Sequence, residues 1–425
     1  MAVYGLIGEK LSHSFSKPIH EQLTGEPYEL FPLSREEFPV FMERREFDGI
    51  NVTIPYKQDV IPYCTAIDER AQRIGAVNTI VCRNGELTGY NTDYDGFSLL
   101  LAENHLPVRG ATALVLGSGG TSKTVRTVLA DQGAKEVLIV SRSPVSGEIS
   151  YEDALSRKDV TFLVNTTPVG MYPHTDRQPI DLAEFPALEG VADVVYNPLR
   201  TRLLQQAEDL KLPCANGLLM LAAQAKYAAE RFRDCRILEE KTLEVLRTLE
   251  NDKCNVALTG MPMCGKSTLG RRLSELLHKK FVDVDEEIEK EASMTVPQIF
   301  ERFGEAGFRE LESRVVAALS QQNGLVISTG GGTVLAPGNI RNLRLNSILL
   351  FIDRPLSRLT VGKGRPLAKS PREIEALYQM RYPIYRANCH CRIENNSDPD
   401  TALSLAVKAY QDFLSGTFRE FGSNR

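Results

Sequence analysis

The stretch GMPMCGKST at residues 260–268 decides the fold of the second half of this 425-residue chain. It fits the pattern G-x-x-x-x-G-K-[ST], with a hydrophobic run before it (NVALTG) and an amphipathic run after it (LGRRLSELL). This order predicts a strand, a phosphate-binding loop and a helix. In such a loop the backbone N–H groups and the helix N-terminus bind phosphate, the lysine bridges the terminal phosphates and the hydroxyl ligates Mg²⁺. The predicted ATP site consists of Met263, Cys264, Gly265, Lys266, Ser267 and Thr268.

The phosphate-binding loop follows about 250 residues that carry a different nucleotide-binding pattern. The stretch TALVLGSGGTS at 112–122 runs from a hydrophobic strand into a glycine-rich turn that fits G-x-G-x-x-G, except that Ser122 takes the last place. The next strand, KEVLIVSRS at 135–143, ends in Ser141, Arg142 and Ser143. An NAD site has an acidic residue there, whereas an arginine and hydroxyls favour the 2′-phosphate of NADP.

Several segments after residue 260 predict what accepts the phosphoryl group. In FVDVDEEIE (281–289), Asp283 and Asp285 alternate at the end of a short strand and are expected to point to the same side. One carboxylate can hold Mg²⁺ through water while the other binds an acceptor hydroxyl. A helix over 299–312 carries Arg309, and a buried strand at 325–334 runs into three glycines that allow a close approach of ligand to backbone.

Together with Arg365 in GKGRPLA and Arg381 in RYPIYR, these motifs resemble shikimate kinase over about residues 254–415. The resemblance implies that shikimate is held by Asp285, Arg309, Gly331 and Arg381. It also implies catalytic roles for Lys266, Asp285 and a lid arginine, Arg365, which would contact ATP as well. Ser267 and Asp283 would hold Mg²⁺, Asp283 through water. The segment around Arg365 is short, which predicts a trimmed lid.

The first hundred residues place polar side chains at the ends of predicted strands. Ser14 and Ser16 alternate in a hydroxyl-rich turn, Lys57 ends the predicted strand DGINVTIPYK (48–57), and Asn78 lies within the predicted strand RIGAVNTIV (73–81). Asp93 follows in GYNTDYDGF. A lysine, a carboxylate, an amide and hydroxyls suit a polyhydroxylated acid as the substrate.

With the motifs NTTPVGM, DVVYNP and GLLMLAAQA, these segments resemble shikimate dehydrogenase over about residues 1–250. By this resemblance Lys57 and Asp93 form the catalytic pair, in which the lysine donates a proton to the developing alkoxide. The implied substrate-binding residues are Ser14, Ser16, Thr53, Lys57, Asn78, Asp93 and Gln224. The implied NADP-binding residues are Gly117, Ser118, Gly119, Gly120, Thr121, Ser141, Arg142, Ser143, Tyr196 and Gly217.

Composition limits the class of protein. The net charge is −5 without a basic stretch, which argues against nucleic acid as a partner. The chain has no apolar run of about 18 residues and no signal-peptide pattern at its N-terminus. Eight scattered cysteines without a C-x-x-C motif suit a reducing cytoplasm. We expect a cytoplasmic enzyme of small molecules, as a monomer or homodimer.

The predicted fold class is α/β, with three domains. Residues 1–100, completed by helices within 217–250, form a substrate domain, and residues 101–216 form a Rossmann domain for NADP. Residues 254–415 form a P-loop kinase domain with a central parallel sheet. Almost no linker separates the two halves, and the dehydrogenase active site is expected in the cleft between the first two domains.

The favoured hypothesis is a bifunctional enzyme of the shikimate pathway that leads to aromatic amino acids. It would reduce 3-dehydroshikimate with NADPH and then phosphorylate shikimate with MgATP. A second hypothesis keeps the folds but has an NAD-dependent quinate-type dehydrogenase and a kinase of another polyol; Arg142 opposes the first part, and the pair Arg309 and Arg381 the second. A third is a ligand-sensing or scaffold protein on inactive enzyme folds, which the presence of Lys57 and Lys266 opposes.

Overall fold

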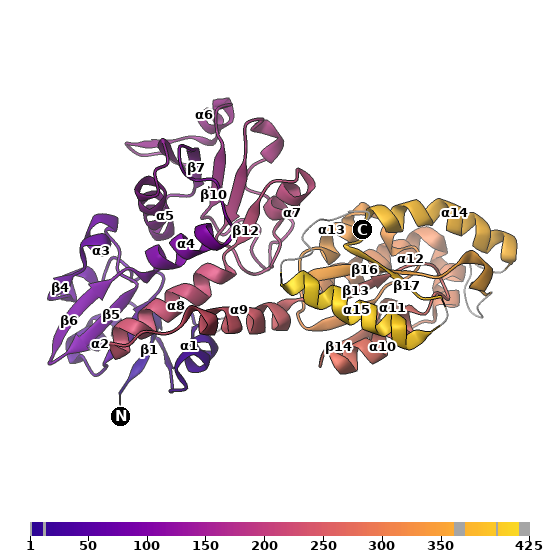
Figure 1. Ribbon diagram of the computed structural model, residues 1–425, viewed down its shortest axis with the longest axis horizontal. Coiled ribbons are helices and arrows are strands. Elements are labelled where there is room, and N and C mark those ends of the chain that lie inside the picture. The colour runs from indigo at the N-terminus through magenta and orange to yellow at the C-terminus, as the bar shows by residue number, and fades with distance from the viewer. Residues whose placement is uncertain (1, 12–13, 361–369, 397, 416–425) are drawn as a thin grey trace. The chain divides into compact units, whose positions relative to one another are not determined.

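The computed structural model describes residues 2–11, 14–360, 370–396 and 398–415 (Figure 1). Contacts along the chain divide it into two compact units. The first comprises Met1–Val169, Gln178–Tyr196 and Leu212–Thr248, and the second comprises Gly170–Arg177, Asn197–Lys211 and Leu249–Arg425.

The first sheet of the first unit is mixed, with the order β2-β1-β3-β5-β6-β4. Its strands are β1 (Tyr4–Gly8), β2 (Glu29–Pro32), β3 (Gly49–Val52), β4 (Ala66–Ile67), β5 (Thr79–Arg83) and β6 (Glu86–Tyr90). The helices of this region are α1 (Ser16–Thr24), α2 (Glu37–Arg44), α3 (Glu69–Ile74) and α4 (Thr92–Glu103). Strands β5 and β6 form a hairpin because Asn84 and Gly85 both adopt positive φ, at 53° and 79°.

The second sheet of the first unit is fully parallel, with the order β12-β11-β10-β7-β8-β9. Its strands are β7 (Thr112–Leu116), β8 (Glu136–Val140), β9 (Glu148–Ile149), β10 (Phe162–Asn165), β11 (Gly190–Asp193) and β12 (Cys214–Asn216), with helices α5 (Gly120–Asp131) and α6 (Tyr151–Ser156). Read from β9, this is the 3-2-1-4-5-6 order of a doubly wound dinucleotide-binding sheet. The expected Rossmann topology is therefore confirmed, and its switch point lies between β7 and β10.

Helix α8 (Leu218–Arg233) returns the chain to the first region and packs beside α4 (Figure 1). A side chain at Gly96 would have its Cβ 2.7 Å from the carbonyl oxygen of Met220, so glycine is what lets the two helices approach. The helical run expected over 217–250 is interrupted, because Asp234 adopts φ 51° and ends α8. Helix α9 (Glu239–Lys253) then begins after a short break.

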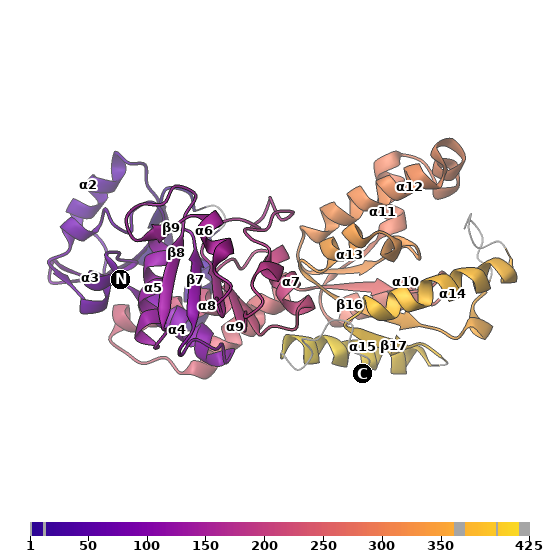
Figure 2. The ribbon, with the colours of Figure 1, turned by 90° about the horizontal axis from the view of Figure 1, so that it is seen from above.

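The second unit has one parallel sheet, with the order β14-β15-β13-β16-β17. Its strands are β13 (Asn255–Thr259), β14 (Lys280–Asp283), β15 (Leu325–Ser328), β16 (Ser347–Asp353) and β17 (Cys391–Glu394). Its helices are α7 (Arg202–Asp209), α10 (Lys266–Leu276), α11 (Val284–Ala292), α12 (Val296–Ser320), α13 (Pro337–Leu343), α14 (Pro371–Ala387) and α15 (Pro399–Leu414). Helices α11, α12 and α13 lie side by side (Figure 2). The expected α/β class and the parallel sheet of the kinase domain are confirmed.

The segment 197–211 groups with this second unit, although the sequence places it within the range of the cofactor domain. Arg200 is buried there and donates hydrogen bonds to the carbonyl oxygens of Arg344 at 2.9 Å and Ser347 at 2.6 Å. Its guanidinium also lies over the ring of Phe413, at 4.8 Å. These acceptors satisfy a buried cation, which a sequence pattern does not reveal.

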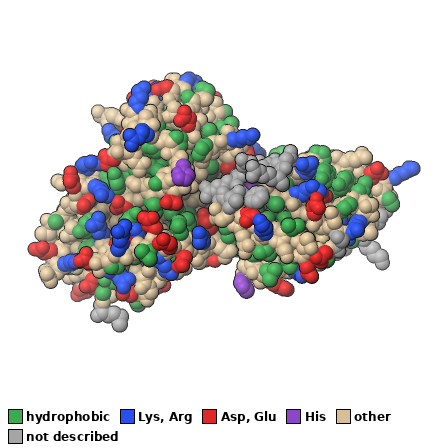
Figure 3. Space-filling model, viewed as in Figure 1, with side chains coloured by type: hydrophobic (Ala, Val, Ile, Leu, Met, Phe, Trp, Pro, Cys, Tyr) green, Lys and Arg blue, Asp and Glu red, His purple; other side chains and the backbone are tan. Residues whose placement is uncertain are grey.

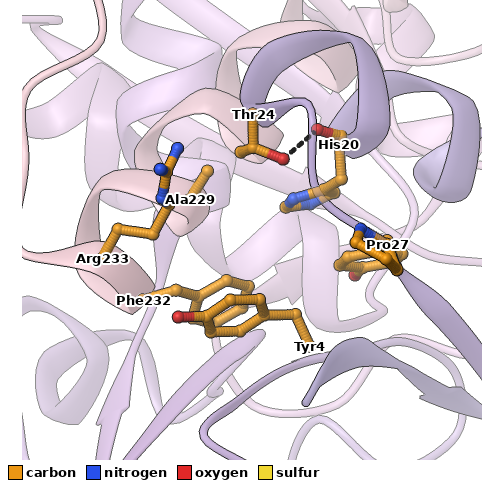
Figure 4. A pocket seen from close by; sticks show the side chains of 8 residues that line it. Tyr4, His20, Thr24, Pro27, Ala229, Phe232 and Arg233 are labelled. Carbon is orange, nitrogen blue, oxygen red and sulfur yellow. Dashed lines mark hydrogen bonds between the residues drawn. The ribbon is translucent and has the colours of Figure 1, made fainter. Parts of the chain in front are cut away.

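An aromatic cluster joins α1, β1, α8 and the residues just before β2 in the first unit (Figure 4). His20 is 2% exposed and stacks on Tyr28 with ring centroids 4.0 Å apart, and Tyr4 stacks on Phe232. Thr24 Oγ1 donates a hydrogen bond to the His20 carbonyl oxygen at 2.8 Å. Burial lowers the pKa of His20 to about 3, so the imidazole is neutral in the folded protein near pH 7.

Candidate active sites

Lys57 and Asp93 are brought together in the first unit. The Lys57 Nζ lies 2.5 Å from Asp93 Oδ2, although the two residues are 36 positions apart. Asp93 is in the first turn of α4, where the helix dipole favours a carboxylate. Lys57 was expected to end a strand, but β3 ends at Val52 and the lysine follows in a turn. The two residues of the predicted pair therefore form an ion pair.

The predicted substrate ligands come from separate segments of the chain. Ser16 does not alternate with Ser14 on extended backbone, since it is the first residue of α1 and its N–H donates to Ser14 Oγ at 3.2 Å. Thr53 directly follows β3 and lies against Gly8, and Gln224 lies on α8, which packs on the helix of Asp93. Asn78 was expected within a strand but precedes β5.

The glycine-rich turn after β7 leaves space for a ligand. Gly117 has φ 104° and packs against Thr166 and Thr167, whereas a Cβ on Gly119 or Gly120 would meet nothing within 4 Å. No side chain caps α5, so its first N–H groups are open to a pyrophosphate. Thr121 lies in the first turn of this helix.

Ser122, in the place of the last glycine, donates to the Gly119 carbonyl oxygen at 2.6 Å and braces the turn. Ser118 and Ser141 meet at the ends of adjacent strands, with their hydroxyls 3.4 Å apart. The Ser143 N–H lies 3.3 Å from Ser141 Oγ, and the Arg142 side chain is exposed. These groups fit a 2′-phosphate at the end of β8.

Tyr196, which was predicted to bind NADP, contacts the turn that was predicted to bind the substrate. The sequence did not indicate this contact. Its ring lies edge-on to Phe15, with centroids 5.9 Å apart, and Phe15 stands between Ser14 and Ser16. Gly217 packs against the carbonyl of Val194, where a side chain would not fit. The Tyr196 ring therefore adjoins the predicted substrate turn.

The phosphate-binding loop of the second unit has its lysine in place. Lys266 is 7% exposed, and its Nζ donates to the carbonyl oxygens of Gly260 at 3.0 Å and Met261 at 2.9 Å. The N-cap of α10, Gly265, has φ 99° and provides no side-chain cap, which leaves the helix N-terminus open to phosphate. Asn395 Nδ2 donates to the Cys264 carbonyl oxygen at 2.8 Å, a support for the loop that the sequence analysis missed.

The residues expected to hold Mg²⁺ lie at the same end of the sheet. Ser267 Oγ donates to Asp283 Oδ2 at 2.7 Å and lies 3.2 Å from Ser328 Oγ. The expected alternation of Asp283 and Asp285 on one strand is wrong. Asp283 ends β14 and caps α11, accepting a hydrogen bond from the Asp285 N–H, so Asp285 lies in the first turn of the helix. Hard oxygen donors of this kind suit Mg²⁺.

Arg309 is held by the carboxylate of Glu312, a residue for which the sequence predicted no role. Glu312 is fully buried, and its Oε2 accepts from Arg309 Nη1 at 2.8 Å while its Oε1 accepts from Thr333 Oγ1 at 2.6 Å. Burial acts to lower the pKa of Arg309, but Glu312 and Glu305 outweigh it and raise that pKa.

The three glycines are packed tightly around these groups. A Cβ on Gly330 would lie 2.6 Å from Glu312 Oε1 and 3.2 Å from Asp285 Oδ1, and one on Gly332 would collide with the Arg309 guanidinium. The Tyr385 hydroxyl donates to the Gly331 carbonyl oxygen. Arg381 is 3% exposed on the helix of Tyr385. The structure thus brings Asp285, Arg309 and Gly331 together, while Arg365 and the expected trimmed lid lie outside the described residues.

Comparison with known proteins identifies both halves. The family model of the shikimate dehydrogenase substrate binding domain matches residues 6–80, and that of shikimate kinase matches residues 262–411. Shikimate dehydrogenase (NADP(+)) of Clostridium beijerinckii is 37% identical over 268 residues, covering 59% of this chain and 99% of that protein. The chain belongs to the shikimate dehydrogenase family. It continues into a shikimate kinase domain, so the predicted pair of activities in the shikimate pathway is confirmed.

Solved structures agree for the dehydrogenase half. A chorismate mutase/shikimate 5-dehydrogenase fusion protein from Clostridium acetobutylicum is 34% identical with a TM-score of 0.56, covering 59% of this chain and 97% of that one. Shikimate 5-dehydrogenase from Thermus thermophilus, in complex with NADP(H) and shikimate, is 30% identical with a TM-score of 0.54, covering 58% and 99%. Among the described residues, no helix combines the length and the apolar character that a membrane span requires.

The stability of the dehydrogenase half should fall in acid because of His20. Its pKa is about 3 in the folded protein and 6.5 ordinarily, so between these pH values the unfolded chain binds a proton that the folded chain does not. Because the pKa of His20 is lower in the folded protein, the free energy of unfolding keeps its full value above pH 6.5. Below pH 6.5 it falls by about 1.4 kcal/mol per pH unit. We expect the inactivation temperature of the dehydrogenase to fall more steeply from pH 6.5 to 4.5 in the native protein than in His20→Phe.

The measurement is residual dehydrogenase activity after heating at each pH, assayed at one fixed pH. The control is His105→Asn at an exposed histidine with positive φ, which asparagine tolerates. This control should keep the native slope. Equal slopes for the native protein and His20→Phe would contradict the prediction.

Proposed function

We propose that the dehydrogenase half reduces 3-dehydroshikimate to shikimate with NADPH, and that the kinase half transfers a phosphoryl group from ATP to the 3-hydroxyl of shikimate. The observation that carries the first part is the 2.5 Å contact of Lys57 Nζ with Asp93 Oδ2. The proposed boundaries are 1–100 with the helices of 217–250 for the substrate domain, 101–216 for the NADP domain and 254–415 for the kinase.

In the dehydrogenase, Lys57 gives its proton to the oxygen of the ketone as that oxygen gains negative charge, and Asp93 keeps the ammonium in position. NADPH, when bound, supplies the hydride. Ser14, Ser16 and Thr53 hold the substrate, together with Asn78 and Gln224. The open turn at Gly117, Gly119 and Gly120 receives the pyrophosphate, with Ser118, Thr121, Ser141, Arg142 and Ser143 on the phosphates and Tyr196 and Gly217 near the nicotinamide.

In the kinase, Arg309 and Arg381 bind the shikimate carboxylate, and the Gly331 backbone borders the ring. Asp285 accepts a hydrogen bond from the hydroxyl that attacks, which orients it. Lys266 binds the terminal phosphates from its place in the loop, with Arg365 steadying the transferred group. Ser267 and Asp283 hold Mg²⁺, which neutralises phosphate charge when bound.

The partners of the protein are small molecules. Acidic and basic side chains are interspersed on the face drawn in Figure 3, and the net charge is −5, which supports an enzyme of metabolites rather than of nucleic acid. A cytoplasmic location and a monomeric or homodimeric state complete the proposal.

A coupled assay tests this function. Purified protein with 3-dehydroshikimate and NADPH should consume NADPH, and later addition of MgATP should release ADP and form shikimate 3-phosphate, detected by mass spectrometry. Quinate with NAD⁺ should react more slowly than shikimate with NADP⁺. Faster turnover of quinate with NAD⁺, or no ADP release with shikimate, would contradict the proposal.

Arg142 should set the cofactor preference. Arg142→Ala removes a charge-assisted hydrogen bond to the 2′-phosphate, so we expect the KM for NADP⁺ to rise about 10- to 100-fold while the KM for NAD⁺ stays within twofold. Steady-state kinetics with both cofactors measure this. The matched control is Arg126→Ala on α5. Equal changes with both cofactors would show that Arg142 does not bind the 2′-phosphate.

A further inference from the structure

The side-chain oxygen of Asn78 is occupied by donors from within the protein. Asn78 Oδ1 accepts from the Thr92 backbone N–H at 2.7 Å and from Thr79 Oγ1 at 3.0 Å. Thr92 Oγ1 lies 3.3 Å away. All three residues are at most 2% exposed. The oxygen end of this amide is therefore turned into the protein.

The backbone donor decides which way the amide points. A main-chain N–H can only donate, so the atom of Asn78 that lies 2.7 Å from Thr92 N must be the acceptor oxygen. Asn78 Nδ2 then faces the opposite way, and no hydrogen bond to it occurs among the described residues. Because Thr92 precedes Asp93, this bond also ties the amide to the helix start that carries the catalytic carboxylate.

Thr79 is in turn fixed by two residues of the substrate domain. Asn51 pairs with Thr79 across the antiparallel strands β3 and β5, and its Nδ2 donates to Thr79 Oγ1 at 3.0 Å and to the Asn78 carbonyl oxygen at 3.2 Å. The Tyr28 hydroxyl donates to Asn51 Oδ1 at 2.7 Å. Because the Asn51 Oδ1 atom accepts from the Tyr28 hydroxyl, an Asn51 amide turned by 180° would lose this hydrogen bond and those that its Nδ2 donates. The Thr79 hydroxyl therefore accepts from Asn51, which leaves its own proton for Asn78 Oδ1 at 3.0 Å or Thr92 Oγ1 at 3.0 Å. In the second case the Thr92 hydroxyl can donate to Asn78 Oδ1, so Thr79 supports the inward position of the amide oxygen either way.

The last residue in this chain of hydrogen bonds, Tyr28, packs in the aromatic cluster of Figure 4. Tyr28 stacks on His20, which lies in the pocket wall with Tyr4 and Phe232. Stacking on His20 fixes the position of the Tyr28 ring and therefore of its hydroxyl group, which orients the Asn51 amide. No member of this chain carries a charge near pH 7, since His20 is neutral there.

We propose that Thr79 is a positioning residue of the dehydrogenase: it fixes the Asn78 amide so that Nδ2, a donor, and not Oδ1 faces the substrate. The proposal rests on the substrate-binding role proposed for Asn78. It follows that the substrate must offer an acceptor at this place, which a ring hydroxyl oxygen does. Without the Thr79 hydroxyl, the amide loses one of the donors that hold its oxygen inward.

The test is Thr79→Val, which removes the hydroxyl at nearly constant volume. We expect the KM for shikimate to rise about 10-fold, with kcat and the KM for NADP⁺ within threefold. Thr79→Ser should restore the native KM. The matched control is Thr88→Val, on the neighbouring strand β6 opposite Val81, which should leave all constants unchanged. Tyr28→Phe, which removes the donor at the far end, should raise the KM for shikimate in the same direction by a smaller factor.

Two measurements separate this role from a purely structural one. With 4-deoxy- and 5-deoxyshikimate, the analogue that lacks the hydroxyl facing Asn78 should show no further rise in KM for Thr79→Val, whereas the other analogue should show the full rise. Equal rises with both analogues would overturn the proposal. If Thr79→Val fails to fold, judged by loss of all dehydrogenase activity and a changed circular dichroism spectrum, Tyr28→Phe with the two analogues provides the same test.

Asn78→Ala distinguishes failure of the two proposals. An unchanged KM for shikimate in Asn78→Ala would remove the role proposed for Asn78 and with it this inference. A raised KM in Asn78→Ala with unchanged kinetics in Thr79→Val would overturn the positioning role alone. A fall in kcat at constant KM in Thr79→Val would also contradict it, because it would place the effect on the reaction and not on substrate binding.

Discussion

Lys57→Ala should lower the dehydrogenase kcat about 10³-fold and leave the kinase activity of the same chain within twofold. The reason is that the ammonium lies 2.5 Å from the Asp93 carboxylate, a contact that would hold the proposed proton donor in place for the developing alkoxide. Alanine removes that proton and leaves Asp93 without its partner. The measurement is initial rates of shikimate oxidation by NADP⁺ and of ADP release in the same preparation.

The kinase rate serves as an internal check that the protein is intact. Lys10→Ala, at an exposed lysine of the same domain, is the matched control and should keep both activities. Asp93→Asn should lower the dehydrogenase rate in the same direction, because the ammonium loses its charged partner. A Lys57→Ala protein that retained more than a tenth of the native rate would refute the assignment of Lys57 as the proton donor.

Lys266→Ala should lower the kinase activity about 10³-fold, while the dehydrogenase activity stays at its native rate. Lys266 Nζ is held by the Gly260 and Met261 carbonyl oxygens at the start of α10, where the helix N-terminus is open. A positive charge at this point stabilises the negative charge that shifts between phosphates during transfer. A coupled pyruvate kinase assay of ADP release measures the effect.

Lys290→Ala is the control for this variant, because Lys290 is an exposed lysine of the same unit that pairs with Glu287 on α11. Surface pairs of this kind contribute little to stability, so both activities should persist. Kinase activity of Lys266→Ala within tenfold of the native rate would contradict the role of the loop. Loss of both activities together would show that the substitution had damaged the fold.

Much of the fold was predictable because its signals are local. The strand before residue 260 and the glycine-rich turn after β7 each follow from a hydrophobic run and the residues beside it. The single helix expected over 299–312 is wrong at one point, because Gly304 adopts φ 68° and interrupts it before Arg309. The error at Asp285 was local too. Alternation suggested a strand, but an acidic cap at Asp283 followed by acidic residues begins a helix, and the capping hydrogen bond determined the outcome.

Contacts between distant segments were not predictable in this way. The sequence predicted no role for Glu312 or Gly96. Glu312 accepts from Thr333, 21 residues away, and Gly96 allows two helices to approach. Asn78 was expected inside a strand because its neighbours are hydrophobic. It lies one residue before β5, and its backbone still bonds Tyr90 and Val52 of the neighbouring strands. Its side chain accepts from the Thr92 N–H at the start of α4, a contact between segments that the local pattern does not contain.

The sequence by itself determined that this protein has two nucleotide-binding halves and which activity each half carries, because those motifs lie within short stretches of chain. Only the tertiary structure decided in which direction the polar side chains point and which groups they bond. The orientation of the Asn78 amide depends on donors 14 residues after it and on an amide 27 residues before it. The phosphate-binding loop could be read from nine residues, but its support by Asn395 comes from a strand end 131 residues further along the chain.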